Sequence, residues 1–228
     1  MPYNSILVMS YKLITVTCPE CGHKQTIEVV SSCNNLFEKE EKEQILNLST
    51  FLTKCEKCNY TYDIVYDCVY VNPVKKFYVY LDSRYRLLHS YCLVSGYKKE
   101  DCNGYRNYGA TNGYDFVNKI VSLDNKLDPR LSELALDITR VRFFKDFPKE
   151  MIDNLYLVEP SNESKGRVTI KLLVDNKAKY FTTDYPSSVF KQIPRNIKTK
   201  LSKVTSLTFD RDDFLSIKDW TYKVELIK

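Results

Sequence analysis

Two Cys-x-x-Cys pairs constrain this chain more than any other feature of its sequence. They are Cys18-Pro19-Glu20-Cys21 and Cys55-Glu56-Lys57-Cys58. This spacing lets a short turn direct two thiolates at one metal ion, and four such ligands complete a tetrahedral site. A closed site of this kind stabilises a fold and leaves no open position for a substrate, so the pairs predict a structural role rather than a reaction.

The metal expected at these four cysteines is zinc, and iron in a rubredoxin-like site fits the same ligands. The alternative is that the pairs are buried free thiols or a dithiol. A thioredoxin-type redox pair would begin a helix in a βαβ unit, whereas strand-like sequence flanks both pairs here. His23 follows Cys21 by two residues and is an alternative ligand, although a solvated residue is the simpler interpretation.

The remaining cysteines show no paired spacing and are interpreted as buried or incidental thiols, with a second metal site as the less simple alternative. They are Cys33, Cys68, Cys92 and Cys102. Eight cysteines are too sparse for a disulfide scaffold in a chain of 228 residues, so we expect a reducing compartment, the cytoplasm. The sequence has no uncharged apolar window of about 18 residues, so no membrane span is predicted. The first residues lack the basic start of an export signal, so export is not expected.

Alternation of β-branched and polar residues predicts a strand on each side of both cysteine pairs. The predicted strands cover residues 11–17 and 25–30 around the first pair, and 51–54 and 61–66 around the second. Two hairpins, each tipped by a cysteine pair, therefore form a ribbon. Strong helix formers over 36–46 predict a short helix, which explains why 33 residues separate the pairs.

The rest of the sequence predicts a mixture of strands and helices. A strand is expected at 76–81, a further strand is one interpretation of 91–94, and three of the six glycines indicate a loop over 104–113. Helices are expected over 115–123 and over 128–144, the second with Asp128 as N-cap and Pro129 at its first position. Strands are expected at 155–158, 167–174 and 179–183, and a partial helix at 189–201. The predicted class is α+β, with a ribbon region at 1–82 and a mixed region at 83–228.

These features together resemble the CpXC proteins, which are bacterial and archaeal proteins of uncharacterised function. The resemblance rests on the knuckle Cys18-Pro19-Glu20-Cys21-Gly22-His23, the helix-bearing spacer, the second pair and the aromatic strand at 76–81. It covers residues 11–82, with a looser match in the helical region downstream. The resemblance implies that Cys18, Cys21, Cys55 and Cys58 are the four shared cysteines of the family.

The second knuckle departs from the family pattern at two positions. Glu56 stands where proline is expected, and Asn59 stands where glycine is expected. Neither change removes a metal ligand. Asparagine tolerates a left-handed backbone better than most residues, so we expect Asn59 to replace glycine in the turn after Cys58.

The positive charge is concentrated in the last third of the chain. Residues 165–228 contain 14 Lys and Arg against 7 Asp and Glu, in a chain of net charge +5. Candidate nucleic-acid contacts are Arg195, Lys198, Lys200, Lys203 and, in the Tyr/Gly-rich loop, Arg106. The alternative interpretation is that these basic residues form the solvent-exposed face of a helix. The sequence pI near 8.6 lies below the value of about 9 that indicates a dedicated nucleic-acid binder.

The sequence offers no catalytic set. It contains two histidines, and no acid/base pair or Ser/His/Asp group can be assembled from them. Gly104 and Gly109 have a phosphate-loop spacing, but Ala110 stands where lysine is required. The leading hypothesis is a cytoplasmic zinc-ribbon scaffold that binds another macromolecule, expected to be a protein. The alternatives are a nucleic-acid binder and an enzyme with an unrecognised site.

Overall fold

The computed structural model of this protein describes residues 10–36, 38–81, 105–110, 112–146, 152–162, 167–174, 177–181 and 195. The chain divides into two compact units, residues 1–116 and 117–228, and the division falls within helix α3 (Gly113–Asp124). Both units combine strands with helices, which confirms the predicted α+β class. The predicted boundary at residue 82 adjoins a segment outside the described residues and stays a prediction.

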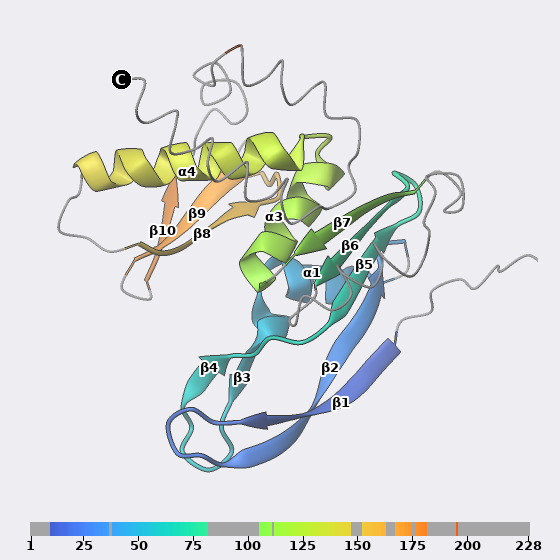
Figure 1. Ribbon diagram of the computed structural model, residues 1–228, viewed down its shortest axis with the longest axis vertical. Helices are drawn as coiled ribbons and strands as arrows, with labels where there is room; N and C mark the ends of the chain where they lie inside the picture. The colour runs from blue at the N-terminus through green and yellow to red at the C-terminus, as the bar shows by residue number, and fades with distance from the viewer. Residues whose placement is uncertain are drawn as a thin grey trace, which may run out of the picture. The chain divides into compact units, whose positions relative to one another are not determined.

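Two antiparallel hairpins carry the cysteine pairs at their tips, as predicted (Figure 1). The longer hairpin joins β1 (Ser10–Thr17) to β2 (Lys24–Asn34), and the shorter joins β3 (Leu52–Lys54) to β4 (Thr61–Asp63). The helix expected in the spacer is also present, as α1 (Lys39–Leu46).

The long hairpin continues into a five-stranded sheet with the order β1-β2-β5-β6-β7. The three added strands are β5 (Cys68–Asn72), β6 (Phe77–Leu81) and β7 (Arg106–Ala110). β5 runs parallel to β2, and β7 runs parallel to β6. One buried row of direct cross-strand partners crosses four of the strands and forms the core face of the sheet: Cys33, Tyr70, Val79 and Tyr108.

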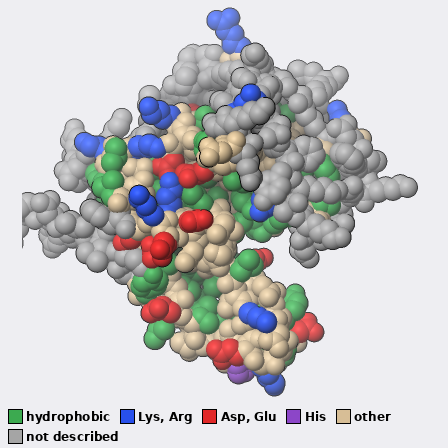
Figure 2. All heavy atoms as spheres, turned by 180° about the vertical axis from the view of Figure 1, so that it is seen from behind, with side chains coloured by type: hydrophobic (Ala, Val, Ile, Leu, Met, Phe, Trp, Pro, Cys, Tyr) green, Lys and Arg blue, Asp and Glu red, His purple; other side chains and the backbone are tan. Residues whose placement is uncertain are grey.

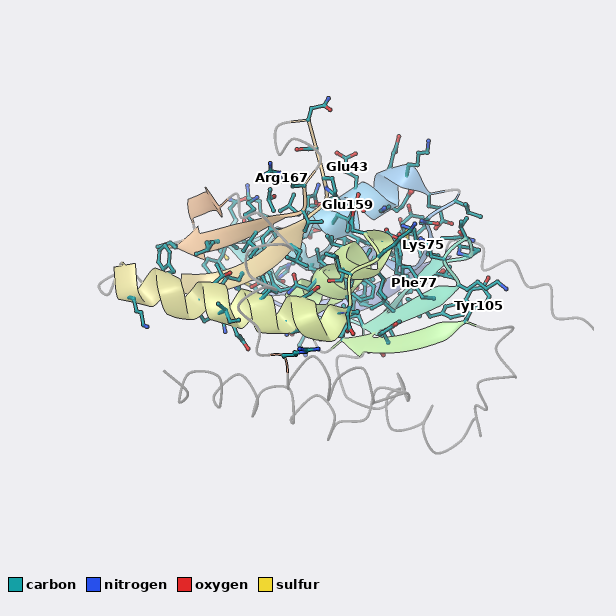
Figure 3. All side chains as sticks on the ribbon, turned by 90° about the horizontal axis from the view of Figure 1, so that it is seen from above. Glu43, Lys75, Phe77, Tyr105, Glu159 and Arg167 are labelled. Carbon is teal, nitrogen blue, oxygen red and sulfur yellow. The ribbon has the colours of Figure 1, made fainter. Side chains whose placement is uncertain are left out.

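The prediction of a loop over 104–113 was wrong, because Arg106–Ala110 pairs with β6 as strand β7. Tyr108 belongs to the buried row and therefore packs in the core. Tyr105 lies just before the strand, with its ring centroid 4.9 Å from that of Tyr78. Figure 3 shows Tyr105 at the same end of the sheet as Lys75 and Phe77, beside the turn that joins β5 to β6.

An aromatic cluster anchors the base of the short hairpin. The 3-10 helix η1 (Ser49–Phe51) leads into β3, and the Phe51 ring lies 5.7 Å from Tyr66 and edge-on to Phe116 at 6.0 Å. The N–H of Ile64 donates to the carbonyl of Phe51 at 2.8 Å. A Cβ at Gly113 would lie 2.9 Å from the Phe51 ring, so only glycine fits where α3 begins.

The second unit contains most of α3, the helix α4 (Pro129–Asp146) and a three-stranded antiparallel sheet. The sheet has the order β10-β9-β8, with β8 (Ile152–Val158), β9 (Thr169–Val174) and β10 (Lys177–Phe181). Both helices and all three strands were predicted. The N–H of Ser132 donates to the carbonyl of Asp128, so α4 begins where the N-cap was expected.

Two predicted elements lie outside the described residues. They are the strand at 91–94 and the partial helix at 189–201, of which only residue 195 is described. Within the described part of the chain, no helix combines the length and the apolar character needed to cross a membrane.

Candidate metal centre

The first knuckle is a tight turn closed by two backbone hydrogen bonds. The N–H of Cys18 donates to the carbonyl of His23 at 2.8 Å, and the N–H of Gly22 donates to the carbonyl of Cys18 at 3.0 Å. The turn reverses the chain between β1 and β2 and directs both cysteine side chains of the pair to one side. Gly22 has φ of 68°, in the left-handed region that glycine adopts at no steric cost.

The second knuckle repeats this backbone. The N–H of Cys55 donates to the carbonyl of Tyr60 at 2.8 Å, and the N–H of Asn59 donates to the carbonyl of Cys55 at 2.9 Å. Asn59 has φ of 61°, so it occupies the left-handed position that Gly22 occupies in the first knuckle. The prediction that Asn59 replaces glycine is therefore confirmed.

The two knuckles bring the four predicted cysteines into one cluster. Two sulfur–sulfur distances between the knuckles, from Cys18 to Cys58 and from Cys21 to Cys55, are both 3.6 Å. All four sulfurs lie within 4.8 Å of one another. A tetrahedral centre with metal–sulfur bonds of about 2.3 Å separates its sulfurs by about 3.8 Å, so this cluster has the size that a four-thiolate metal site requires.

The cluster is buried on one side only. Cys18 and Cys55 are buried, Cys21 is half-buried and Cys58 is exposed. Each knuckle therefore supplies one buried cysteine and one cysteine that is more exposed. His23 is half-buried and does not belong to the cluster, which favours its interpretation as a solvated residue.

The charges around the cluster favour a cation. Desolvation opposes the Cys55 thiolate, but the backbone N–H groups of Cys58 and Lys57, together with the thiols of Cys58 and Cys21, outweigh it and lower the pKa of Cys55 to about 6. At Cys58 the backbone N–H of Tyr60 is outweighed by desolvation and the neighbouring thiols, which raise its pKa to about 12. Desolvation, followed by the charges of all four cysteines, raises the pKa of Tyr62. The Tyr62 hydroxyl is buried and has no hydrogen-bond partner among the described residues. Thiolates that lie close together with little solvent around them repel one another. A bound metal ion offsets this repulsion with its positive charge.

Gln25 connects the two knuckles and was not identified from the sequence. Its Nε2 donates to the carbonyl of Lys54 at 3.0 Å, and its Oε1 accepts from the N–H of Glu56 at 3.0 Å. The side chain thus pairs with the backbone on both sides of Cys55. A signal was present in the sequence, because the alternation of β2 puts Gln25 on the same face as Ile27 and Val29, where an apolar residue is expected.

The other described cysteines are buried thiols, as predicted. Cys33 and Cys68 lie in the core of the first unit. Desolvation and the nearby Glu38 raise the pKa of Cys33, and desolvation raises the pKa of Cys68 to about 12. Neither belongs to a potential metal cluster among the described residues. Cys92 and Cys102 lie outside that part of the chain.

The predicted nucleic-acid contacts are only partly within the described residues. Arg195 is exposed, and Arg106 lies in β7, where its side chain is not described. Lys198, Lys200 and Lys203 lie outside the described part of the chain. The basic surface therefore stays a prediction.

Comparison with protein families identifies a match. The family described as CpXC protein matches residues 16–135, which is more than half of the chain and includes both knuckles. The match extends beyond the ribbon into α3 and the start of α4, the region where the sequence resemblance was looser. No curated protein and no solved structure matches this chain. The four clustered cysteines and the family match agree, and the chain belongs to the CpXC family.

Proposed function

We propose that the four cysteines bind one structural zinc ion and that the ribbon they stabilise is a non-catalytic binding module for another protein. The observation that supports this best is the sulfur cluster, with distances of 3.6 Å between the two knuckles. Four thiolates fill the coordination sphere of zinc and leave no position for a substrate. A reducing compartment such as the cytoplasm keeps the thiolates available.

The short hairpin explains why a metal is needed. Its strands β3 and β4 have three residues each, and an isolated hairpin is marginally stable at best. A structural zinc ion contributes on the order of 10 kcal/mol to the folding of a small module. The metal therefore holds β3 and β4 against the long hairpin.

Exposed apolar side chains support the binding role. Large hydrophobic residues with high exposure are concentrated on and beside the two hairpins: Tyr11, Leu13, Leu52, Tyr60 and Val65. Of the other two in the described part of the chain, Leu36 follows β2 by two residues and Val74 lies between β5 and β6. Figure 2 shows hydrophobic side chains on the surface of the hairpin region. Leu13 is 71% exposed on an edge strand, a position that suits contact with a protein partner.

Metal analysis of purified protein tests the zinc site. We expect about one zinc ion per chain in the wild type and in Cys68→Ala, which removes a buried thiol outside the cluster. Cys58→Ser should lose most of the zinc in a chelator challenge, and because Cys58 is exposed, this change costs little packing. Iron would appear as visible charge-transfer absorption. Wild-type protein with neither metal, or equal retention in both variants, would contradict the site.

Affinity purification from the native host tests the binding role. Leu13→Asp should reduce recovery of a partner that the wild type retains, because it places a charge on an exposed apolar position. Thr15→Asp is the matched control, since Thr15 is exposed on the same face of β1. Recovery should persist at high salt. A partner that is a nucleic acid and dissociates steeply with salt would instead favour the alternative function.

A further inference from the structure

We infer that Gln25 is a positioning residue for the metal, and that its two hydrogen bonds control how readily Cys55 leaves the metal site. This inference rests on the metal site proposed above. Gln25 is 6% exposed and lies in β2, three residues after the first knuckle's Gly22. Both of its hydrogen bonds are to backbone groups and not to the sulfurs of the cluster. It acts on Cys55 through the backbone of the two neighbouring residues.

The geometry of the contact restricts the second knuckle. Nε2 donates to the carbonyl of Lys54, the residue before Cys55, and Oε1 accepts from the N–H of Glu56, the residue after it. One planar amide thus bridges both sides of a single residue, as a neighbouring strand would. The backbone at Cys55 cannot move away from the first knuckle unless both bonds break.

The burial pattern shows why Cys55 is the cysteine that needs this support. Cys55 is fully buried, whereas Cys58 in the same knuckle is exposed. The exposed Cys58 can leave and return without disturbing the interior. Both cysteines have a sulfur of the first knuckle at 3.6 Å, but only Cys55 is buried, so its movement opens the interior of the cluster. The hydrogen bonds of Gln25 therefore act on the step that exposes the metal to solvent and to competing ligands.

Two hydrogen bonds cannot replace the metal. Each contributes about 1 kcal/mol net, far less than a bound zinc ion, so the ribbon still depends on the metal for its folding. Their effect is on the metal-bound state, in which they keep Cys55 in its place as a metal ligand. Residues that orient metal ligands in this way change metal affinity by about 10-fold to 100-fold when they are replaced.

Zinc transfer to a chromogenic chelator tests this role. Gln25→Met keeps the length of the side chain and its burial but makes neither hydrogen bond. We expect zinc release from Gln25→Met to be about 10-fold to 100-fold faster than from the wild type. Thr26→Val is the control, because Thr26 is exposed on the opposite face of the same strand, and its release rate should match the wild type.

Hydrogen exchange on the zinc-loaded proteins separates positioning from general destabilisation. In Gln25→Met the amide of Glu56 should lose protection, while the core amides of Tyr70 and Val79 keep theirs. The inference is overturned if release rates are equal, or if faster release occurs only together with faster exchange in that core. If wild-type protein binds no zinc at all, the proposed metal site fails as well, and the two failures are thereby distinguished.

Discussion

Gly22 and Asn59 occupy equivalent positions in two knuckles that share one backbone conformation. Both have positive φ, and both donate their N–H to the first cysteine of their own pair. The chain therefore needs a residue that adopts the left-handed conformation at each turn, and the residue type is secondary. This explains how the second knuckle departs from the family pattern without losing the geometry of its cysteines.

Replacement of Asn59 tests this requirement directly. Asn59→Val should destabilise the metal-loaded protein by about 1–2 kcal/mol, because a β-branched residue is strained at positive φ. Asn59→Gly should be close to neutral, since relief of strain is offset by the greater freedom of the unfolded chain. Denaturant unfolding measures both. Lys57→Val, an exposed change in the same knuckle, is the control, and an equal loss in both valine variants would contradict the role of φ.

At the scale of elements, sequence patterns identified most helices and strands but missed two strands of the main sheet. No strand was predicted at β5, because residues 64–71 form a largely apolar run without a glycine or proline to mark where one strand ends and the next begins. β7 contains Asn107 and Gly109, which indicate a turn when read locally. Its strand conformation comes from parallel pairing with β6, a contact that local sequence does not encode.

The second unit contains a contact of the same non-local kind. Asn118 is buried in α3, and its Oδ1 accepts a hydrogen bond from the N–H of Leu157 in β8 at 2.8 Å. Leu157 lies on the edge strand of the three-stranded sheet. The asparagine therefore satisfies a buried N–H that the sheet leaves unpaired. Neither residue shows this role in the sequence.

Asn118→Leu should remove this bond with little change in volume. We expect the second unit to lose about 1–3 kcal/mol of stability, the cost of a buried N–H without a partner. Hydrogen exchange at the Leu157 amide should accelerate. Asn125→Leu is the control, because the carbonyl that its side chain contacts, that of Val121, also accepts a backbone N–H. Unchanged protection at Leu157 would contradict the assignment.

For the whole molecule, the sequence predicted the class of fold and the residues that can bind the metal, and it did not predict what holds the two knuckles together. Spacing alone identifies Cys18, Cys21, Cys55 and Cys58, because ligand geometry depends on a short turn. The role of Gln25 depends on which residues of the two hairpins face each other, and that register is set by tertiary packing. Local patterns therefore predict ligands better than the residues that position them.

Removal of the metal should separate the parts of the molecule that depend on it from those that do not. Chelation should expose the amides of β3, β4 and the β1–β2 tip, because β3 and β4 have three residues each and the cysteine cluster joins them to that tip. The β8–β9 pair should keep its protection, since its stability comes from the sheet and helices of the second unit. Hydrogen exchange before and after chelation measures both regions, and zinc added back should restore the hairpins. Loss of protection throughout both units would show instead that the metal supports the entire fold, and the ribbon would then be a condition for folding rather than a separately stabilised module.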